Sequence, residues 1–132
     1  MKLITRNTDY ALRALCYIAK RKNLVAVDEL VQKLGVPRSF IRKILQQLNK
    51  KNILASFKGQ GGGFKLKTSH GRVNIVEIMR IFQGPVEFSG CMLKKDICPN
   101  IGKCALRKRL RVIEKDMLRQ LKSITIASLI QG

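Results

Sequence analysis

The stretch "GVPRSFIRKILQQLNKKNILASFKGQGGGFKLK", residues 35–67, carries the pattern that decides the fold. Its first part can open a helix at Pro37, because the missing N–H of proline is not needed in the first turn of a helix. Apolar residues then follow the i, i+3, i+4, i+7 spacing of one helix face. They are Ile41, Ile44, Leu45 and Leu48. The pattern predicts a helix with one buried face and a basic, amide-rich outer face.

The residues before this helix predict two further helices. Apolar residues recur with helical spacing over residues 27–34, and Gly35 then breaks the pattern. Another helix is expected over residues 9–19, with Thr8 or Asn7 as its N-cap. Two short helices joined by a tight glycine-containing turn, the second with a basic outer face, are typical of a helix-turn-helix.

The second part of the stretch predicts a β-hairpin. Residues 53–58 and 64–67 have the composition of short strands, and "GQGGG", residues 59–63, must form a turn with unusual backbone angles. This glycine run lacks the spacing of a phosphate-binding loop and joins two strands, so a nucleotide site is not expected. A helix-turn-helix followed by a basic hairpin is the winged-helix arrangement, which binds DNA with a helix and a wing.

The charge of the chain agrees with a polyanionic partner. The 132 residues, the usual size of one domain, include 27 Lys and Arg against 8 Asp and Glu, a formal net charge of +19. No apolar run approaches the roughly 20 residues that cross a bilayer. We therefore expect a cytoplasmic protein without a membrane partner. The N-terminal residues predict an amphipathic helix and not a signal peptide.

The C-terminal third predicts a separate unit. Asn74 and Glu77 form a capping pair for a helix that continues through Phe82, and Gly84 and Pro85 end it. The expected domains are therefore a winged helix-turn-helix over residues 1–84, and a cysteine loop with a dimerisation helix over residues 85–132.

A long helix is expected over residues 104–123, with one apolar stripe among many charges. Such a stripe packs either on its own domain or on a second copy of the chain, and two-fold symmetry suits a DNA-binding protein. We expect a homodimer, with the final residues 125–132 forming a short helix that docks back. The stripe consists of Leu106, Leu110, Ile113, Met117 and Leu121.

Three cysteines lie in one loop, "CMLKKDICPNIGKC", as Cys91, Cys98 and Cys104. In a reducing compartment clustered thiols indicate metal or redox chemistry before disulfides. An iron–sulfur cluster, a zinc site, and free or redox-active thiols are all compatible with the spacing, although zinc sites often use C-x2-C pairs, which are absent here. The remaining cysteine, Cys16, lies on an apolar helix face and is expected to pack there, and His70 is expected at the surface.

Four motifs occur together in a recognisable order. They are "TDYALRAL" (8–15), "GVPRSFIRKILQQL" (35–48), "KGQGGGFKL" (58–66), and the cysteine loop followed by "ALRKRLR" (105–111). On these residues the chain resembles, almost end to end, the IscR/NsrR/RirA family of bacterial iron–sulfur winged-helix transcription regulators. The resemblance implies a dimer whose three cysteines hold a cluster and whose long helix forms the interface.

The resemblance also implies roles for single residues. The family's base-reading positions fall on Pro37, Arg38, Ser39 and Arg42, and its minor-groove wing position falls on Lys58. The basic residues that accompany them on the same helix and hairpin are Lys43, Lys65 and Lys67.

IscR-like members supply a histidine as fourth ligand where this chain has Arg107, which cannot bind iron. NsrR-like members use an acidic residue from the partner subunit, and the corresponding residue is Asp9. This departure favours the NsrR branch and a four-iron, four-sulfur cluster, with a two-iron, two-sulfur cluster as the alternative.

The expected fold is mainly α with a small β-hairpin: a winged helix-turn-helix plus a long C-terminal dimerisation helix. The expected function is that of a sequence-specific repressor of transcription, in which the cluster senses nitric oxide, iron or redox state. A zinc- or thiol-based redox regulator on the same scaffold is the main alternative, and a basic RNA-associated protein is a further one. With no nucleophile–base pair and no carboxylate pair in the sequence, neither an enzyme nor a small-molecule substrate is expected.

Overall fold

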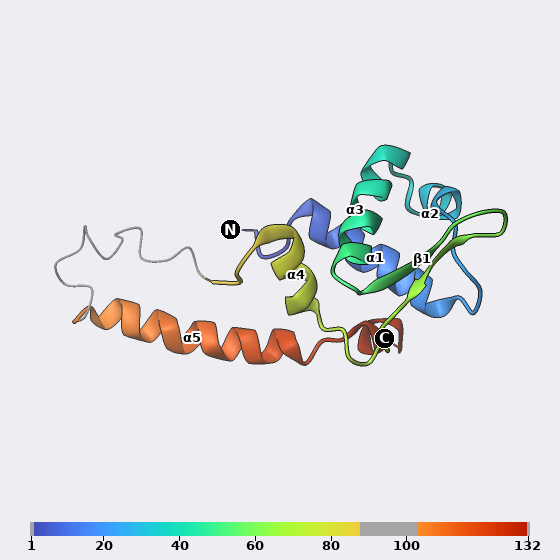
Figure 1. Ribbon diagram of the computed structural model, residues 1–132. Helices are drawn as coiled ribbons and strands as arrows, with labels where there is room; N and C mark the ends of the chain where they lie inside the picture. The colour runs from blue at the N-terminus through green and yellow to red at the C-terminus, as the bar shows by residue number, and fades with distance from the viewer. Residues whose placement is uncertain (1, 88–102, 132) are drawn as a thin grey trace.

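Six helices and one hairpin make up the described part of the chain, residues 2–87 and 103–131 of a computed structural model (Figure 1). In chain order the elements are α1 (Arg6–Lys20), α2 (Val27–Leu34), α3 (Arg38–Lys50), β1 (Leu54–Phe57), β2 (Gly63–Leu66), α4 (Ile75–Gln83), α5 (Ala105–Lys122) and α6 (Ile126–Gln131). This order is the winged helix-turn-helix with a long C-terminal helix that the sequence predicts.

Helix α1 begins at Arg6, earlier than predicted. Its N-cap is Thr5, whose side-chain oxygen accepts a hydrogen bond from the Thr8 backbone N–H at 3.4 Å. The predicted cap at Thr8 or Asn7 is therefore wrong. Thr8 is fully buried inside the helix, and its hydroxyl donates to Gln83 Oε1 at 2.7 Å. The sequence predicted Thr8 as a local cap, whereas its side chain forms a tertiary hydrogen bond.

The turn between α2 and α3 depends on one glycine and one proline. Gly35 caps α2 in the left-handed region with φ 66°, and its N–H donates to the carbonyl of Val31 at 2.9 Å. Pro37 is the N-cap of α3, and its carbonyl accepts from the N–H groups of Phe40 and Ile41. Pro37 therefore lies one position before the helix that it was predicted to open.

The wing is an antiparallel pair in which Leu54 lies opposite Leu66 and Phe57 lies opposite Gly63. A third segment joins it, because Val25 and Phe64 exchange two backbone hydrogen bonds of 2.9 and 2.8 Å. The strands match the predicted runs to within one or two residues. The bridge at Val25 ties the wing to the loop between α1 and α2.

The core lies between α1, α3 and α4, and α6 extends it. Apolar residues of α1 and α3 are buried as predicted, among them Leu15 and Ile41, and Ile78 of α4 is buried with them. Helix α6 docks through fully buried Ile126, whose N–H donates to the carbonyl of Val73 at 2.9 Å. The division into residues 1–84 and 85–132 remains a prediction. Helix α6 belongs to the second range by sequence but packs on the core of the first.

Helix α5 has a different environment along its length. Figure 1 shows its N-terminal part extending past α4, away from the other described elements. Leu121, near its C-terminal end, is buried in the core, whereas Leu106, Leu110 and Ile113 are exposed. The predicted apolar stripe therefore packs on its own domain at one end only.

A hydrogen-bond cluster joins the beginning of α1 to the end of α4. Gln83 Oε1 accepts from the Thr5 backbone N–H at 3.1 Å and from the Thr8 hydroxyl, and Gln83 Nε2 donates to the carbonyl of Leu3 at 2.9 Å. Asn74 caps the other end of α4 as predicted, accepting from the Glu77 N–H at 3.2 Å. The chain thus leaves α4 at a point fixed against the N-terminus.

Candidate nucleic-acid interface and cysteine segment

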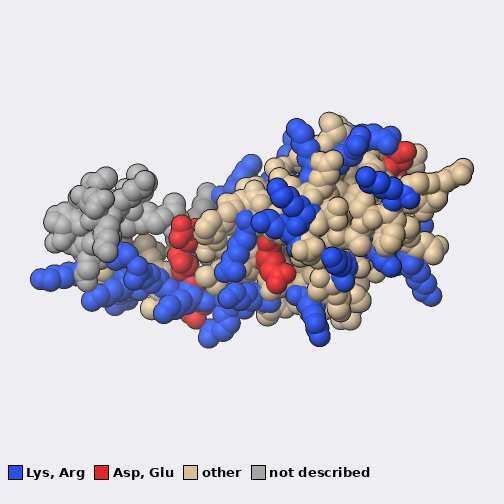
Figure 2. All heavy atoms as spheres, in the orientation of Figure 1, with Lys and Arg blue, Asp and Glu red and all other residues tan. Residues whose placement is uncertain are grey.

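The outer face of α3 carries the candidate base-reading side chains. The helix turns its apolar residues into the core, which leaves the opposite face to solvent. All five candidates are exposed: Pro37, Arg38, Ser39, Arg42 and Lys43. Figure 2 shows Lys and Arg side chains spread over the visible face of the molecule, with few acidic groups between them.

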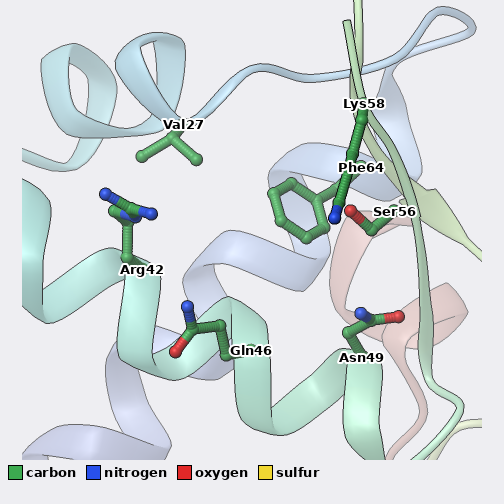
Figure 3. A pocket seen from close by; sticks show the side chains of 7 residues that line it. All are labelled: Val27, Arg42, Gln46, Asn49, Ser56, Lys58 and Phe64. Atoms are coloured by element: carbon green, nitrogen blue, oxygen red, sulfur yellow. The ribbon is translucent and has the colours of Figure 1, made fainter.

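A hollow of about 320 Å³ lies between α3 and the wing (Figure 3). Arg42, Gln46 and Asn49 project into it from successive turns of α3, and Lys58 reaches toward it from the wing. Its complete lining is Val27, Arg42, Gln46, Asn49, Ser56, Lys58 and Phe64. Arg42 from the helix and Lys58 from the hairpin, predicted separately, are thus brought to one concave surface.

Sequence reasoning did not include Gln46, Asn49 or Ser56 among the site residues. The spacing of Gln46 and Asn49, four and seven residues after Arg42, was the available signal, because these positions share a helix face. Ser56 could not be found in this way, since its place follows from the pairing of β1 with β2. Amide side chains on such a face suit hydrogen bonds to adenine edges.

Two of the candidate side chains contact neighbouring groups of the chain itself. Arg38 Nη1 donates to Asp28 Oδ1 of α2 at 2.6 Å, and both side chains are largely exposed. In the wing, Lys67 Nζ donates to Asn52 Oδ1 at 3.2 Å. Both contacts are open to solvent, so a nucleic acid can reach the same groups.

Lys65 on β2 makes a contact within the wing. Its ammonium sits 5.1 Å from the centre of the Phe57 ring, which is itself 44% exposed. This cation–π contact orders an exposed lysine at the hairpin. The three wing lysines, Lys58, Lys65 and Lys67, are all exposed.

A basic and aromatic cluster flanks the start of α3. The Arg6 guanidinium lies 5.4 Å from the ring centre of Phe40 and 5.8 Å from that of Tyr10. The two rings meet edge to face with centroids 5.5 Å apart. Sequence reasoning did not single out this cluster, because it depends on the packing of α1 against α3.

The cysteine segment is only partly described. Cys91 and Cys98 lie outside the described residues. Cys104 is half-buried, has no disulfide partner among the described residues, and is the N-cap of α5. Within residues 2–87 and 103–131, no three His, Cys, Asp or Glu side chains gather into a metal-binding group.

Asp9 lies in the first turn of α1, where its carboxylate accepts from Arg13 Nε at 3.2 Å. Its side chain is 48% exposed, so a second molecule can reach it. Asp9 directly follows Thr8, whose hydroxyl donates to Gln83 Oε1. Surface ion pairs of this kind contribute little to stability, so Asp9 can exchange its partner at low cost.

Cys16 and His70, neither of which is a candidate metal ligand, lie where the sequence predicts. Cys16 is half-buried on α1 and packs against the core. Burial raises the pKa of the Cys16 thiol, and nearby Lys20 opposes this only in part. A thiol with a raised pKa is a poor metal ligand at neutral pH, because the thiolate is the binding form. His70 is exposed.

Comparison with known proteins identifies the family. A profile of the Rrf2 family, described as "Iron-dependent Transcriptional regulator", matches residues 4–132. The chain belongs to the Rrf2 family. Members of this family are transcriptional regulators that bind DNA, not enzymes. The resemblance drawn from the sequence motifs is thereby confirmed, and an RNA-associated role is set aside.

Relatives of this Rrf2-family chain are described as HTH-type transcriptional regulators. An HTH-type transcriptional regulator of Aquifex aeolicus is 30% identical over 124 residues, which cover 92% of this chain and 86% of that protein. An rrf2-like HTH-type regulator of Rhodobacter capsulatus is 27% identical over 138 residues, and the alignment covers 97% of this chain and 92% of that protein.

Solved structures share the fold. CymR of B. subtilis, called the global cysteine regulator, has a TM-score of 0.84 at 20% identity, covering 99% of this chain and 98% of CymR. T. potens IscR has a TM-score of 0.77 at 17% identity, covering 99% of this chain and 87% of that one. At these identities the likeness establishes the winged-helix fold alone. None of the helices in residues 2–87 and 103–131 is both long and apolar enough to span a membrane.

Proposed function

We propose that this Rrf2-family regulator is a cytoplasmic, homodimeric repressor whose affinity for one DNA sequence depends on an iron–sulfur cluster. The observation that carries the DNA-binding part is the hollow between α3 and the wing. There Arg42, Gln46 and Lys58 converge from two elements on one concave, cationic surface. A recognition helix in the major groove and a wing along the backbone would place DNA against this surface.

The residues of this surface divide into two roles. Arg38 and Arg42 suit bidentate contact with guanine, while Pro37 and Ser39 lie beside them at the start of α3 and contact the same bases. Lys43, Lys58, Lys65 and Lys67 carry point charges that suit phosphates, which add affinity on any sequence and make it salt-dependent.

The dimer is proposed from the exposed part of α5. Leu106, Leu110 and Ile113 are 66%, 41% and 53% exposed, and they follow one face of the helix. Met117 is half-buried, and Leu121 lies in the chain's own core. A second copy that packs on the exposed part of the stripe would remove these side chains from water and set the distance between two recognition helices.

The residues present fit an iron–sulfur cluster. Cys104 lies at the N-terminus of the 18-residue helix α5, a position that stabilises nearby negative charge, as in thiolate ligands and their cluster. Cys91 and Cys98 would supply two further thiolates. We propose Asp9 of the partner subunit as the fourth ligand, since its carboxylate is half-exposed and, in the part of the chain that the structure describes, pairs with Arg13 alone. Such a cluster, with four irons in preference to two, supplies the reactivity toward nitric oxide, oxygen or iron shortage.

The chain itself would transmit the state of this segment to DNA. Gln83 fixes the end of α4 against the N-terminus of α1, and Cys104 fixes the start of α5. Ligation of the cysteines would therefore restrain α5 relative to the winged helix. Release would loosen that restraint and with it the spacing of the two recognition helices, which lowers affinity for the operator.

A thiol- or zinc-based redox regulator on the same scaffold is the second candidate. The observation that favours it is the likeness to CymR, a global cysteine regulator, which was also solved in an oxidised form from S. aureus with a TM-score of 0.75. In that case Cys91, Cys98 and Cys104 would form disulfides or bind zinc, and Asp9 would have no role.

The test is to purify the full chain without oxygen and to measure iron, sulfide and zinc per chain with the visible absorption spectrum. We expect iron and sulfide in wild type, their loss in Cys98→Ala, and a cluster that forms but decays faster in Asp9→Ala, because a carboxylate ligand is missing. Glu77→Ala, which removes an exposed acid at a helix start elsewhere, is the control. Zinc without sulfide, or no metal with reversible thiol oxidation, would favour the second candidate instead.

The origin of the fourth ligand can be tested by complementation. A heterodimer is made from one Asp9→Ala subunit and one Cys98→Ala subunit. If Asp9 acts across the dimer, the intact cysteines of the first subunit meet the intact Asp9 of the second, and one cluster of wild-type stability forms. A decay rate equal to that of the Asp9→Ala homodimer would show that the ligand comes from the same chain or that Asp9 is not a ligand.

A further inference from the structure

An acidic side chain lies directly beside a proposed base-reading arginine. Residues 1–67 contain three acidic residues, Asp9, Asp28 and Glu29. Asp9 pairs with Arg13, and Glu29 accepts hydrogen bonds from Tyr17 and lies 3.4 Å from Arg21 Nε. Asp28 is the one of these three that pairs with the recognition helix, through Arg38.

The position of Asp28 is electrostatically unfavourable for binding a polyanion. Its side chain is 72% exposed, at the first turn of α2 and against the first residue of α3. The N-terminal residues of a recognition helix are those that approach DNA most closely. A carboxylate here repels phosphates, and it occupies a guanidinium that would otherwise contribute to binding on any sequence.

The geometry of the pair leaves part of Arg38 available. Asp28 Oδ1 accepts from Nη1 of Arg38 at 2.6 Å, and this is the one contact between the two side chains. A guanidinium has five N–H donors in a rigid plane. The edge formed by Nε and Nη2 therefore has no partner among the described residues, and it has the two parallel donors that recognise O6 and N7 of guanine.

We propose that Asp28 is a specificity-determining residue that acts by positioning Arg38, an inference that rests on the proposed DNA-binding function. On the correct site Asp28 holds Arg38 with its free edge toward a guanine, and the ion pair persists. On other sequences Arg38 can turn that free edge toward a phosphate only by rotating away from Asp28, which weakens the pair, so binding is opposed. Asp28 thus lowers affinity for random DNA more than affinity for the operator.

The experiment compares preferred and random DNA. The site is first selected from random duplexes by the wild-type protein, and dissociation constants are then measured on that site and on a scrambled duplex at one salt concentration. Asp28→Asn should bind scrambled DNA about three- to tenfold more tightly, because one repulsive charge is gone and Arg38 is released. Its affinity for the selected site should change by about twofold or less, or decrease. The discrimination ratio, which is the affinity for the selected site divided by that for scrambled DNA, should therefore fall.

The matched control is Asp116→Asn. Asp116 on α5 accepts from Arg119 Nη2 at 2.8 Å in another largely exposed ion pair, so this variant removes the same charge away from the DNA-binding surface. It should leave the discrimination ratio within about twofold of wild type, since it shifts only the overall field. An Asp28→Asn variant whose two affinities move in parallel, as in the control, overturns the proposal.

A double-mutant cycle separates positioning from plain charge. In an Arg38→Ala background, Asp28→Asn should no longer change the discrimination ratio, because the residue through which it acts is absent. An undiminished change would show that Asp28 acts on DNA without Arg38 and would overturn the positioning role. Asp28→Glu, which can still pair with Arg38, should retain more discrimination than Asp28→Asn. If the wild-type protein selects no sequence at all, the proposed function itself fails, whereas a selected site with no effect of Asp28→Asn contradicts this inference alone.

Discussion

Helices α3 and α5 have the same kind of sequence and different surroundings. Both are basic and amphipathic, but α3 buries its whole apolar face, with Ile41, Leu45 and Leu48 removed from solvent. Helix α5 is longer and buries only Leu121 of its described residues, while Leu106 remains 66% exposed. An apolar stripe therefore indicates that a partner surface exists, but it does not say whether that surface belongs to the same chain.

This difference separates a self-sufficient part from a dependent one. The winged helix closes its core with α1, α4 and α6 of the same chain. The exposed part of α5 has no such cover among residues 2–87 and 103–131 of the same chain, and the proposed dimer supplies it.

The largest effect is expected when the exposed part of the apolar stripe on α5 is made polar. The variant Leu110→Asp with Ile113→Asp should be monomeric by light scattering, because two charges would have to be buried in the interface. Binding to a two-fold operator should weaken by about 100-fold or more, since the two recognition helices are no longer linked. Thermal unfolding of the winged helix should stay cooperative, because neither side chain belongs to its core.

Leu129→Asp is the control for this variant. Leu129 on α6 is 42% exposed, similar to Leu110 at 41%, but it lies outside the proposed interface. It should leave the dimer intact. A dimeric Leu110→Asp, Ile113→Asp protein would show that the stripe packs elsewhere and that another surface joins the subunits.

In the winged helix, the α3 side and the wing side of the hollow should contribute differently to DNA affinity. Arg42→Ala should lose about 1–3 kcal/mol on the preferred DNA site and much less on random DNA, if Arg42 reads a base. Lys58→Ala should weaken both by similar factors and flatten the dependence of log affinity on log salt, if Lys58 binds a phosphate. Quantitative binding over a salt series measures both effects. Equal losses for Arg42→Ala on both DNAs would remove its base-reading role.

The smallest effects are expected at Cys16, which belongs to the packed region and not to the cysteine segment. Cys16→Ala should cost about 1 kcal/mol of stability from the loss of one partly buried sulfur atom, and iron per chain should not change. Because burial raises the pKa of this thiol, its alkylation rate should still be rising at a pH where an ordinary thiol is fully ionised. Mass spectrometry of the labelled peptide measures this rate. Loss of iron in Cys16→Ala would make Cys16 a ligand.

The features that sequence reasoning predicted depend on local pattern. The apolar period of α3, the breaking of α2 at Gly35 and the cap at Asn74 each involve residues within one or two turns of each other. The wing followed from the glycine run and the alternation around it. Such signals arise from backbone preferences and from one buried face, and both are visible in a short window.

The features that were missed depend on contacts between distant segments. Thr8 was assigned to a cap because nothing local reveals Gln83, which is 75 residues away. The bridge between Val25 and Phe64 and the ion pair between Asp28 and Arg38 likewise appear only after the helices have packed. For the stripe of α5, periodicity correctly gave one apolar face, but not the point along the helix at which its burial ends.

The glycines of the wing have a consequence for the genetics of this protein. A Cβ atom at Gly62 would lie 2.2 Å from the carbonyl oxygen of Phe57, and one at Gly63 would lie 2.6 Å from that of Val25. At Gly59 and Gly61 a Cβ would meet nothing within 4 Å, although the backbone is left-handed there. Every missense change in a glycine codon adds a Cβ. The codons for Gly62 and Gly63 are therefore places where any amino-acid replacement deforms the wing, and alleles that lose DNA binding should accumulate there more than at the two open glycines.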